Sequence, residues 1–270
     1  MTEIDDAFVR QVRAIAELGA AEALRAFRTD VGIDNKAGPG AFDPVTEADR
    51  ATESVIRAAI ADAFPEHDIL GEEHGATDRG SPWRWVIDPI DGTRGFMCGT
   101  PTWTTLVAVE HHGRPVVGVI VQPYTGETWV GRPGRCDLYT SRGHRRVQAA
   151  AVTDIEAARL STTDPRALPI GYFQLEEAEA FAALGSRVRV TRFGHDAYAY
   201  ALLATGCIDL VVETGLQRYD VAALVPVVEG AGGCISGWYG EPAADASRIV
   251  ASATPTLHEA ALDALRRASS

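Results

Sequence analysis

One hexapeptide constrains the fold of this 270-residue chain more than any other segment: Asp88-Pro89-Ile90-Asp91-Gly92-Thr93. It follows an apolar run, Trp83 to Ile87, that is typical of a strand, so two carboxylates leave the strand end three positions apart. Pro89 restricts its own backbone and that of Asp88, which fixes the angle between the carboxylates. Gly92 lets the backbone approach a ligand, and Arg94 to Cys98 can begin a helix whose free N–H groups point back. The segment therefore predicts carboxylates for a hard cation beside amides for a phosphate.

The rest of the chain supports this interpretation over a simple Asx turn with an exposed second Asp, which an Asp-x-x-Asp pair alone would favour. Gly71-Glu72-Glu73 follows another short apolar run, and Tyr219-Asp220-Val221-Ala222-Ala223 opens an apolar helix far downstream. Each of these acidic groups lies at the end of an element. Three groups of carboxylates at element ends supply the number of oxygen ligands that a site for several cations needs.

Together with Val45-Thr46-Glu47-Ala48-Asp49, these motifs resemble the inositol monophosphatase superfamily, in the family's order and over roughly residues 5 to 265. The resemblance implies an α+β fold, a layered αβαβα sandwich of the metal-dependent sugar-phosphatase type. It also implies a homodimer and two or three Mg²⁺ ions in each active site. The metal ligands that it implies are all oxygens, which favours Mg²⁺ over Zn²⁺: Glu72, Asp88, the carbonyl of Ile90, Asp91 and Asp220.

The resemblance also assigns roles. Asp88 would bridge two ions, Glu72 would complete the first ion's ligands, and Asp91 and Asp220 those of the second. The Thr93 hydroxyl would orient the attacking water and Asp49 would hold or deprotonate it, with Glu72 as the third catalytic candidate. An acidic residue at a helix start also stabilises that helix, so Asp49 has a structural interpretation as well. The amides of Gly92 and Thr93 would receive the phosphate.

Two segments, 93–103 and 215–233, together with 192–200, look more like the histidinol-phosphatase branch than the inositol branch. Histidinol phosphate carries an ammonium and an imidazole, which carboxylates such as Asp196 and Glu213 would attract. We therefore expect histidinol phosphate as the substrate, with inositol 1-phosphate or a related polyol phosphate as the alternative. The expected substrate contacts are Gly92, Thr93, Arg94, Gly194, His195, Asp196, Glu213 and Asp220.

The chain departs from that branch in two places, at His195 and at Arg218. A cation beside Asp220 could assist phosphate binding or oppose the ammonium of the substrate. His195 and Asp196 could also simply start and cap a helix. A different class of function stays open too, because some superfamily members act as binding partners in transcription complexes. The complete set of metal ligands favours an enzyme.

The net charge of −12 and the pI of about 5.0 argue against nucleic acid or an anionic membrane as a partner. The N-terminus has no basic-then-apolar signal pattern, and no apolar run approaches the ~20 residues of a membrane span, so we expect a cytoplasmic protein. The four cysteines are widely spaced and predict reduced thiols. Cys136 and Arg142 have the C-x₅-R spacing of a thiol phosphatase, but the intervening loop holds an acid and no glycine.

The predicted strands and helices are grouped before about residue 150 and alternate after it, which indicates two α/β halves. The half 1–150 carries the metal motifs, and the half 151–270 carries the substrate contacts and the last metal ligand. Helices are expected at about 7–27 and 46–63, a β-meander at 103–131, and further helices near 175–184, 196–205, 220–231 and 255–268. Pro226 should kink the third of these later helices. We expect a loop at Gly38-Pro39-Gly40, and His67 in a solvated loop.

Overall fold

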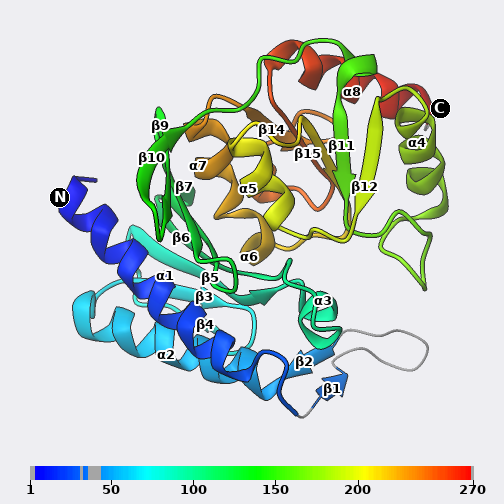
Figure 1. Ribbon diagram of the computed structural model, residues 1–270. Coiled ribbons are helices and arrows are strands. Elements are labelled where there is room, and N and C mark those ends of the chain that lie inside the picture. Colours follow the sequence, from blue (N-terminus) through cyan, green and yellow to red (C-terminus); the bar gives the residue numbers. More distant parts are fainter. Residues whose placement is uncertain (1–3, 31–32, 36–43, 269–270) are drawn as a thin grey trace.

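The computed structural model of this protein describes residues 4–30, 33–35 and 44–268, and the predicted Gly38-Pro39-Gly40 loop lies outside them. Two β-sheets alternate with three layers of helices (Figure 1). The helices α1 and α2 form one outer layer, α5 to α7 lie between the sheets, and α4 and α8 cover the far side. The predicted αβαβα sandwich is therefore confirmed.

The first sheet has the strand order β10-β9-β8-β7-β6-β5-β3-β4. Only β3 and β5 pair in parallel; every other neighbouring pair of this sheet is antiparallel. The predicted meander forms its centre. The strands are β3 (Asp68–Gly71), β4 (Gly75–Thr77), β5 (Trp83–Asp91), β6 (Thr104–His111), β7 (Arg114–Gln122), β8 (Glu127–Arg132), β9 (Arg135–Thr140) and β10 (Gly143–Val147).

The second sheet has the order β12-β11-β13-β15-β14, with β12, β11 and β13 parallel. Its strands are β11 (Arg159–Thr162), β12 (Val190–Phe193), β13 (Leu210–Glu213), β14 (Cys234–Gly237) and β15 (Ile249–Ser252). A short pair, β1 (Ile33–Asn35) and β2 (Pro44–Thr46), leads into α2. The helices are α1 (Asp6–Ala26), α2 (Glu47–Ala63), α3 (Thr93–Met97), α4 (Leu175–Gly185), α5 (Tyr198–Ala204), α6 (Arg218–Val221), α7 (Leu224–Gly230) and α8 (Pro255–Ala268).

The two outer helices of the first sheet follow from their sequences. In α1, Phe8, Val12 and Ile15 recur at helical spacing and are buried against the sheet, while the Asp5 carboxylate caps the helix by accepting the Phe8 N–H. In α2, Thr46 and Asp49 form a capping box. Both helices begin and end within a residue of the expected positions.

The predicted helix at 220–231 is instead two helices. The first, α6, ends at Val221, and Pro226 then lies in the first turn of α7, where its missing N–H breaks no helical hydrogen bond. The chain is therefore broken before the proline and not kinked at it. A Cβ at Gly131 of β8 would lie only 2.3 Å from the Pro226 backbone, so α7 rests directly on the first sheet. This contact fixes the position of α6, which carries Asp220.

The expectation for His67 is wrong. Its ring is 8% exposed and lies stacked near Phe64 and Trp83, and its Nδ1 accepts the indole N–H of Trp85 at 3.0 Å. The local sequence around His67 is polar and gives no sign that its ring is buried. The aromatic rings that cover it come from the C-terminal end of α2 and from β5. Burial lowers the pKa of His67 and favours its neutral form.

Candidate metal centre and active site

A cavity of about 640 Å³ lies where the two sheets and the middle helices meet. Its walls come from the turn after β3, the end of β5, the start of α3, the loops after β11, β12 and β13, and α6. The lining includes most of the predicted site residues: Glu72, Asp88, Ile90, Asp91, Gly92, Thr93, Arg94, Asp196, Glu213 and Asp220. Segments far apart in the sequence therefore converge on one space.

A β-bulge in β5 brings Asp88 and Asp91 together. Residues three apart on a regular strand point to opposite faces of the sheet. Here Asp88 pairs with Leu106 and Asp91 with Thr104, so β5 has one more residue than β6 between the two pairs. The extra residue rotates the chain and turns Asp91 toward the face of Asp88. Pro89, which has no N–H to give to the ladder, lies inside this bulge.

Asp220 of α6 completes a cluster with Asp88 and Asp91, in which the three carboxylate oxygens lie within 4.8 Å of one another. Burial raises the pKa of Asp88 well above its usual value, and the nearby Glu72, Asp91 and Asp220 raise it further. Burial likewise raises the pKa of Asp91, and the charge of Asp196 adds to this effect. The site therefore crowds carboxyl groups whose simultaneous ionisation is unfavourable unless a counter-charge is present.

This cluster fits a hard divalent cation. Oδ1 of Asp88 is buried and has no hydrogen-bond partner within the part of the chain that the structure describes, although buried carboxylate oxygens are normally satisfied. The donors are carboxylates, the ligand type that Mg²⁺ and Ca²⁺ prefer. A cation at this point would supply the missing partner and offset the repulsion between the carboxylates.

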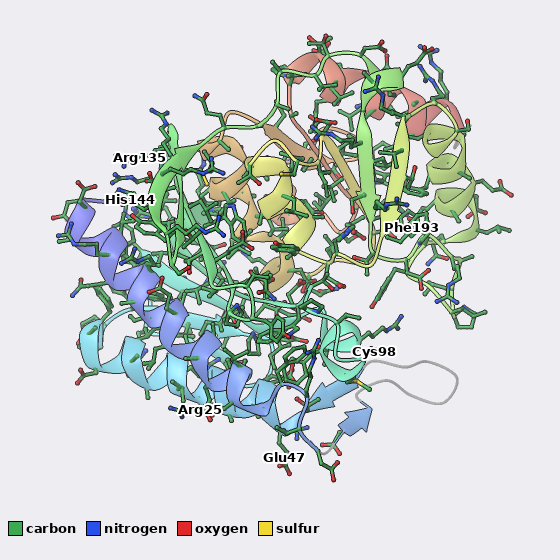
Figure 2. All side chains as sticks on the ribbon, viewed as in Figure 1. Arg25, Glu47, Cys98, Arg135, His144 and Phe193 are labelled. Carbon is green, nitrogen blue, oxygen red and sulfur yellow. The ribbon has the colours of Figure 1, made fainter. Side chains whose placement is uncertain are left out.

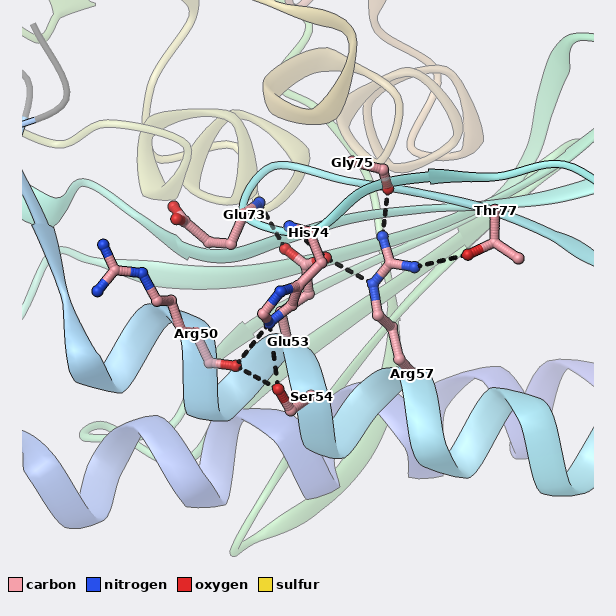
Figure 3. Close-up of polar contacts among 8 residues, drawn as sticks. All are labelled: Arg50, Glu53, Ser54, Arg57, Glu73, His74, Gly75 and Thr77. Atoms are coloured by element: carbon pink, nitrogen blue, oxygen red, sulfur yellow. Dashed lines mark hydrogen bonds and ion pairs between the residues drawn. The ribbon is translucent and has the colours of Figure 1, made fainter.

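Glu72 belongs to the turn between β3 and β4. Glu53 of α2 stabilises this turn by accepting hydrogen bonds from the next two residues (Figure 3). The fully buried Glu53 carboxylate accepts the N–H of Glu73 at 2.7 Å and that of His74 at 3.2 Å, and it pairs with Arg57 at 2.7 Å. Gly71 is required next to it, since a Cβ there would lie 1.9 Å from a Glu53 oxygen. Arg57 also donates to the Gly75 carbonyl, which ties the turn to α2.

Sequence reasoning missed Glu53, although a signal exists. Glu53, Ile56 and Ile60 have the i, i+3, i+7 spacing of one helix face, and all three are fully buried. An ionisable residue on an otherwise apolar face needs a buried partner. That pattern indicates a structural carboxylate beneath the Gly-Glu-Glu turn.

Asp49 and Thr93 have clear structural partners. The Asp49 carboxylate accepts the Thr46 N–H at 2.8 Å and the Thr46 hydroxyl at 2.5 Å, as the second half of the capping box of α2. Thr93 lines the cavity, and its hydroxyl donates to the Ile90 carbonyl at 3.0 Å. The helix-start interpretation of Asp49 is thus confirmed, and its catalytic role stays a prediction.

The predicted substrate contacts divide into two groups. Gly92 has a left-handed backbone with φ of 83°, and the Asp196 carboxylate lies against it and near Gly95. Asp196 therefore lies beside the turn that joins Asp91 to α3, where the phosphate-binding amides are expected. Gly194 and His195 are absent from the cavity lining within the described residues; the His195 ring lies 3.0 Å from the Ser161 hydroxyl.

Glu213 ends β13 and is buried. Its carboxylate accepts the N–H and the hydroxyl of Thr163 at 2.7 and 2.9 Å. Burial raises the pKa of Glu213 to about 8, while burial raises that of Asp196 to about 6. Arg94 lies above the ring of Tyr172, with 4.5 Å between its guanidinium carbon and the ring centre. Tyr172 and the buried Tyr200 line the cavity too and were missed by sequence reasoning.

Arg218, next to Asp220 in the sequence, could have assisted phosphate binding or opposed the ammonium of the substrate. Its side chain is absent from the cavity lining within the described residues. Its guanidinium pairs with Glu110 at 2.7 Å and Asp245 at 3.0 Å, and donates to the Gly113 carbonyl at 2.6 Å. It therefore fastens α6 to the first sheet. Cys136 is likewise structural, since burial raises the pKa of its thiol to about 12.

Comparison with known proteins agrees with this geometry. Residues 4–270 match the model of the inositol monophosphatase family. The chain is 36% identical to the bifunctional phosphatase IMPL2, chloroplastic, of Arabidopsis thaliana, over 98% of this chain and 76% of that protein. It is 35% identical to the histidinol-phosphatase of Mycobacterium tuberculosis, over 76% of each. A solved structure of an inositol monophosphatase from Zymomonas mobilis superposes with a TM-score of 0.83 at 35% identity, over 98% of this chain and 99% of that one. With its carboxylate cluster and this matched fold, the chain belongs to the inositol monophosphatase family of metal-dependent phosphomonoesterases.

Proposed function

We propose that this phosphomonoesterase hydrolyses L-histidinol phosphate to L-histidinol and phosphate. One observation carries the proposal: Asp196 and Glu213 add two carboxyl groups to the cavity that also holds the Asp88, Asp91 and Asp220 cluster. Burial raises the pKa of both, and a cationic group beside them would lower it and favour their charged forms. An ester with a cationic organic part suits such a wall better than an uncharged polyol does. The histidinol-phosphatase relative supports the same substrate.

The metal requirement follows from the cluster. Glu72, Asp88, Asp91, Asp220 and the Ile90 carbonyl would hold two or three Mg²⁺ ions. When bound, these ions would neutralise the phosphate, activate a water and stabilise the leaving alkoxide.

The chain's own groups would then act around the ester. The N–H groups of Gly92 and Thr93 would donate to phosphate oxygens, because both residues lie at the N-terminal end of α3 and line the cavity. The Thr93 hydroxyl would orient the attacking water, with Asp49 as the group that holds or takes its proton. Asp196 and Glu213 would hold the ammonium or the imidazolium end. Arg94 would serve the phosphate side, from its place above Tyr172.

Inositol 1-phosphate is the second candidate. Glu213 occupies a position that would contact substrate in either branch, and the Zymomonas mobilis inositol monophosphatase is as similar in sequence as the histidinol-phosphatase is. A protein-binding role that retains the fold is the third candidate. The clustered carboxylates favour catalysis over that role.

We also propose a cytoplasmic homodimer built from two closely packed halves, 1–150 and 151–270. Several large apolar side chains that a subunit contact would cover are exposed in and after the 163–173 segment and on β12: Leu168, Ile170, Leu175 and Phe193. In the described residues no helix is long and apolar enough to cross a bilayer. Light scattering during gel filtration would test the dimer, since a monomeric mass would contradict it.

A panel of phosphomonoesters tests the function. The purified protein with Mg²⁺ is assayed for released phosphate on L-histidinol phosphate, inositol 1-phosphate and p-nitrophenyl phosphate, with and without EDTA. The proposal expects the highest kcat/KM for histidinol phosphate and no turnover after chelation. A higher value for inositol 1-phosphate would select the second candidate, and no turnover of any ester would select the binding role.

A further inference from the structure

A second cavity, of about 190 Å³, lies between the N-terminal half of α1 and the strands β8, β9 and β10. Figure 2 shows two of its residues, Arg135 and His144, beside the N-terminal end of α1 and far from Cys98, which follows the metal-site helix α3. Its charged lining consists of four arginines and two aspartates: Arg10, Arg13, Arg132, Arg135, Asp6 and Asp137. The proposed phosphatase activity uses none of these residues.

Ion pairs engage three of the four arginines, and the pair between Arg13 and Glu17, at 3.6 Å, is the longest of them. Arg132 pairs with Asp6 at 2.6 Å, and Arg135 pairs with Asp137 at 2.6 Å. Arg10 is exposed and has no side-chain hydrogen bond or ion pair to any described residue. Among the described residues, the guanidinium of Arg10 is therefore left without a carboxylate partner, and Arg13 has only the longer contact to Glu17, in a chain whose net charge is −12.

The Arg13 guanidinium is held over the Tyr139 ring, and not all of its N–H groups have an acceptor among the described residues. Its Nε is buried without a hydrogen-bond partner in the described part of the chain, and the nearest carboxylate oxygen, of Glu17, is 3.6 Å away. Its guanidinium carbon lies 4.0 Å from the ring centre of Tyr139, and the His144 ring stacks on the same tyrosine at 5.2 Å. A guanidinium fixed on a ring loses little freedom when an anion binds.

The cations act together across the pocket. The pKa of the Asp6 carboxyl is lowered, first by the hydrogen bond and the charge of Arg132, and further by the charges of Arg135 and Arg10. A second negative group in the same place would meet the same attraction. Guanidinium groups form two parallel hydrogen bonds to phosphate, which makes them the preferred protein ligand for that anion.

We propose that this arginine pocket binds a small phosphate-bearing anion, either inorganic phosphate or a phosphate monoester with a small organic part. Arg10 supplies the charge that no carboxylate of the described residues pairs with, while Arg13, Arg132 and Arg135 supply N–H donors that their carboxylate partners leave over. The cavity has room for a phosphate group and a few further atoms, not for a macromolecular partner. The site is separate from the metal cluster and does not depend on hydrolysis.

Calorimetric titration of the metal-free protein tests this. Inorganic phosphate and methyl phosphate are titrated at 25 °C in EDTA, with sodium chloride holding the ionic strength constant. Under chelation the crowded carboxylates of the active site oppose an anion at Arg94 and at the Gly92 and Thr93 amides, and a loss of affinity in Arg10→Gln assigns the saturable binding to the arginine pocket. We expect one site per chain, with affinity reduced about threefold to tenfold by Arg10→Gln and by Arg135→Gln.

The matched control is Arg145→Gln, which removes an exposed arginine of β10 outside the pocket and should leave the affinity within twofold. Arg10→Gln decides the outcome because Arg10 holds no other part of the structure, whereas Arg135→Gln also frees Asp137. No saturable binding by the unmodified protein up to 50 mM would overturn the proposal, as would unchanged affinity of Arg10→Gln. Equal binding of both anions would show recognition of the phosphate group; binding of inorganic phosphate alone would identify the free ion as ligand. A protein that hydrolyses no ester but binds phosphate this way would leave the inference intact.

Discussion

Two sets of carboxylates, one fully buried and one at the metal centre, differ in their partners. Glu53, Glu110 and Asp209 are fully buried, and each faces an arginine: Arg57 for Glu53, Arg84 and Arg218 for Glu110, and Arg159 for Asp209. At the metal centre, Asp88, Asp91 and Asp220 instead face one another.

The difference separates structure from function. A buried carboxylate loses its hydration when the chain folds, so the folded protein needs an arginine beside it to balance its charge. Carboxylates that face one another raise the free energy of the metal-free protein, and only a cation from outside the chain can relieve this. Substitutions in the two sets should therefore have opposite effects on stability.

The largest effect is expected when a paired carboxylate loses its arginine. Arg159→Ala would leave Asp209 fully buried without its cation, which should lower the free energy of unfolding by about 3–5 kcal/mol. Urea denaturation measures this, with Arg187→Ala, the loss of an exposed arginine, as the control. A change below 1 kcal/mol would remove the basis for calling this pair structural.

At the metal centre the effect should fall on turnover. Asp91→Asn keeps the hydrogen bond from the Ala197 N–H but removes a charge from the cluster, so kcat should fall by about 10²-fold or more. The metal-free variant should melt at the same temperature as the unmodified protein or higher, because repulsion is relieved. Near-normal kcat, or a clear loss of stability in EDTA, would place Asp91 with the structural set.

Asp196 tests where the metal centre ends and substrate recognition begins. Asp196→Asn should raise KM for histidinol phosphate by about 10-fold or more, from the loss of a charge-assisted hydrogen bond worth ~1.5–3 kcal/mol. The uncharged ester p-nitrophenyl phosphate should be nearly unaffected. Because Asp196 lies against Gly92, equal losses on both esters are the informative alternative: they would assign it to the phosphate end.

The smallest effect concerns His67, a buried titratable group whose partner is neutral. Burial lowers its pKa, so its contribution to stability is complete above the free imidazole value of about 6.5 and is lost as the pH falls through the lower folded value. The stability difference between the unmodified protein and His67→Gln should therefore shrink from pH 7.5 to pH 5. His112→Asn, in an exposed turn, is the control. A constant difference would mean that His67 titrates normally.

The sequence predicted the acidic cluster of Asp88, Asp91 and Asp220, because the motifs that carry them resemble a known family and each lies at the end of a recognisable element. It did not predict how Asp88 and Asp91 come to share a face, since the bulge depends on pairing with β6. The sequence also could not predict where the Arg218 side chain points, because its partners Glu110 and Asp245 lie far from it in the sequence. The elements were predictable from periodicity; the break between α6 and α7 was not, because it depends on packing against the glycine of β8.

The distribution of the metal ligands along the chain has a consequence for biosynthesis. Asp88 and Asp91 leave the ribosome long before Asp220, whose helix α6 is set in place by packing on the first sheet and by the contact of Arg218 with Asp245. A nascent or truncated chain thus holds an acidic fragment of the centre without its last ligand. We therefore expect full cation affinity, and with it activity during refolding, only after α6 has packed into place.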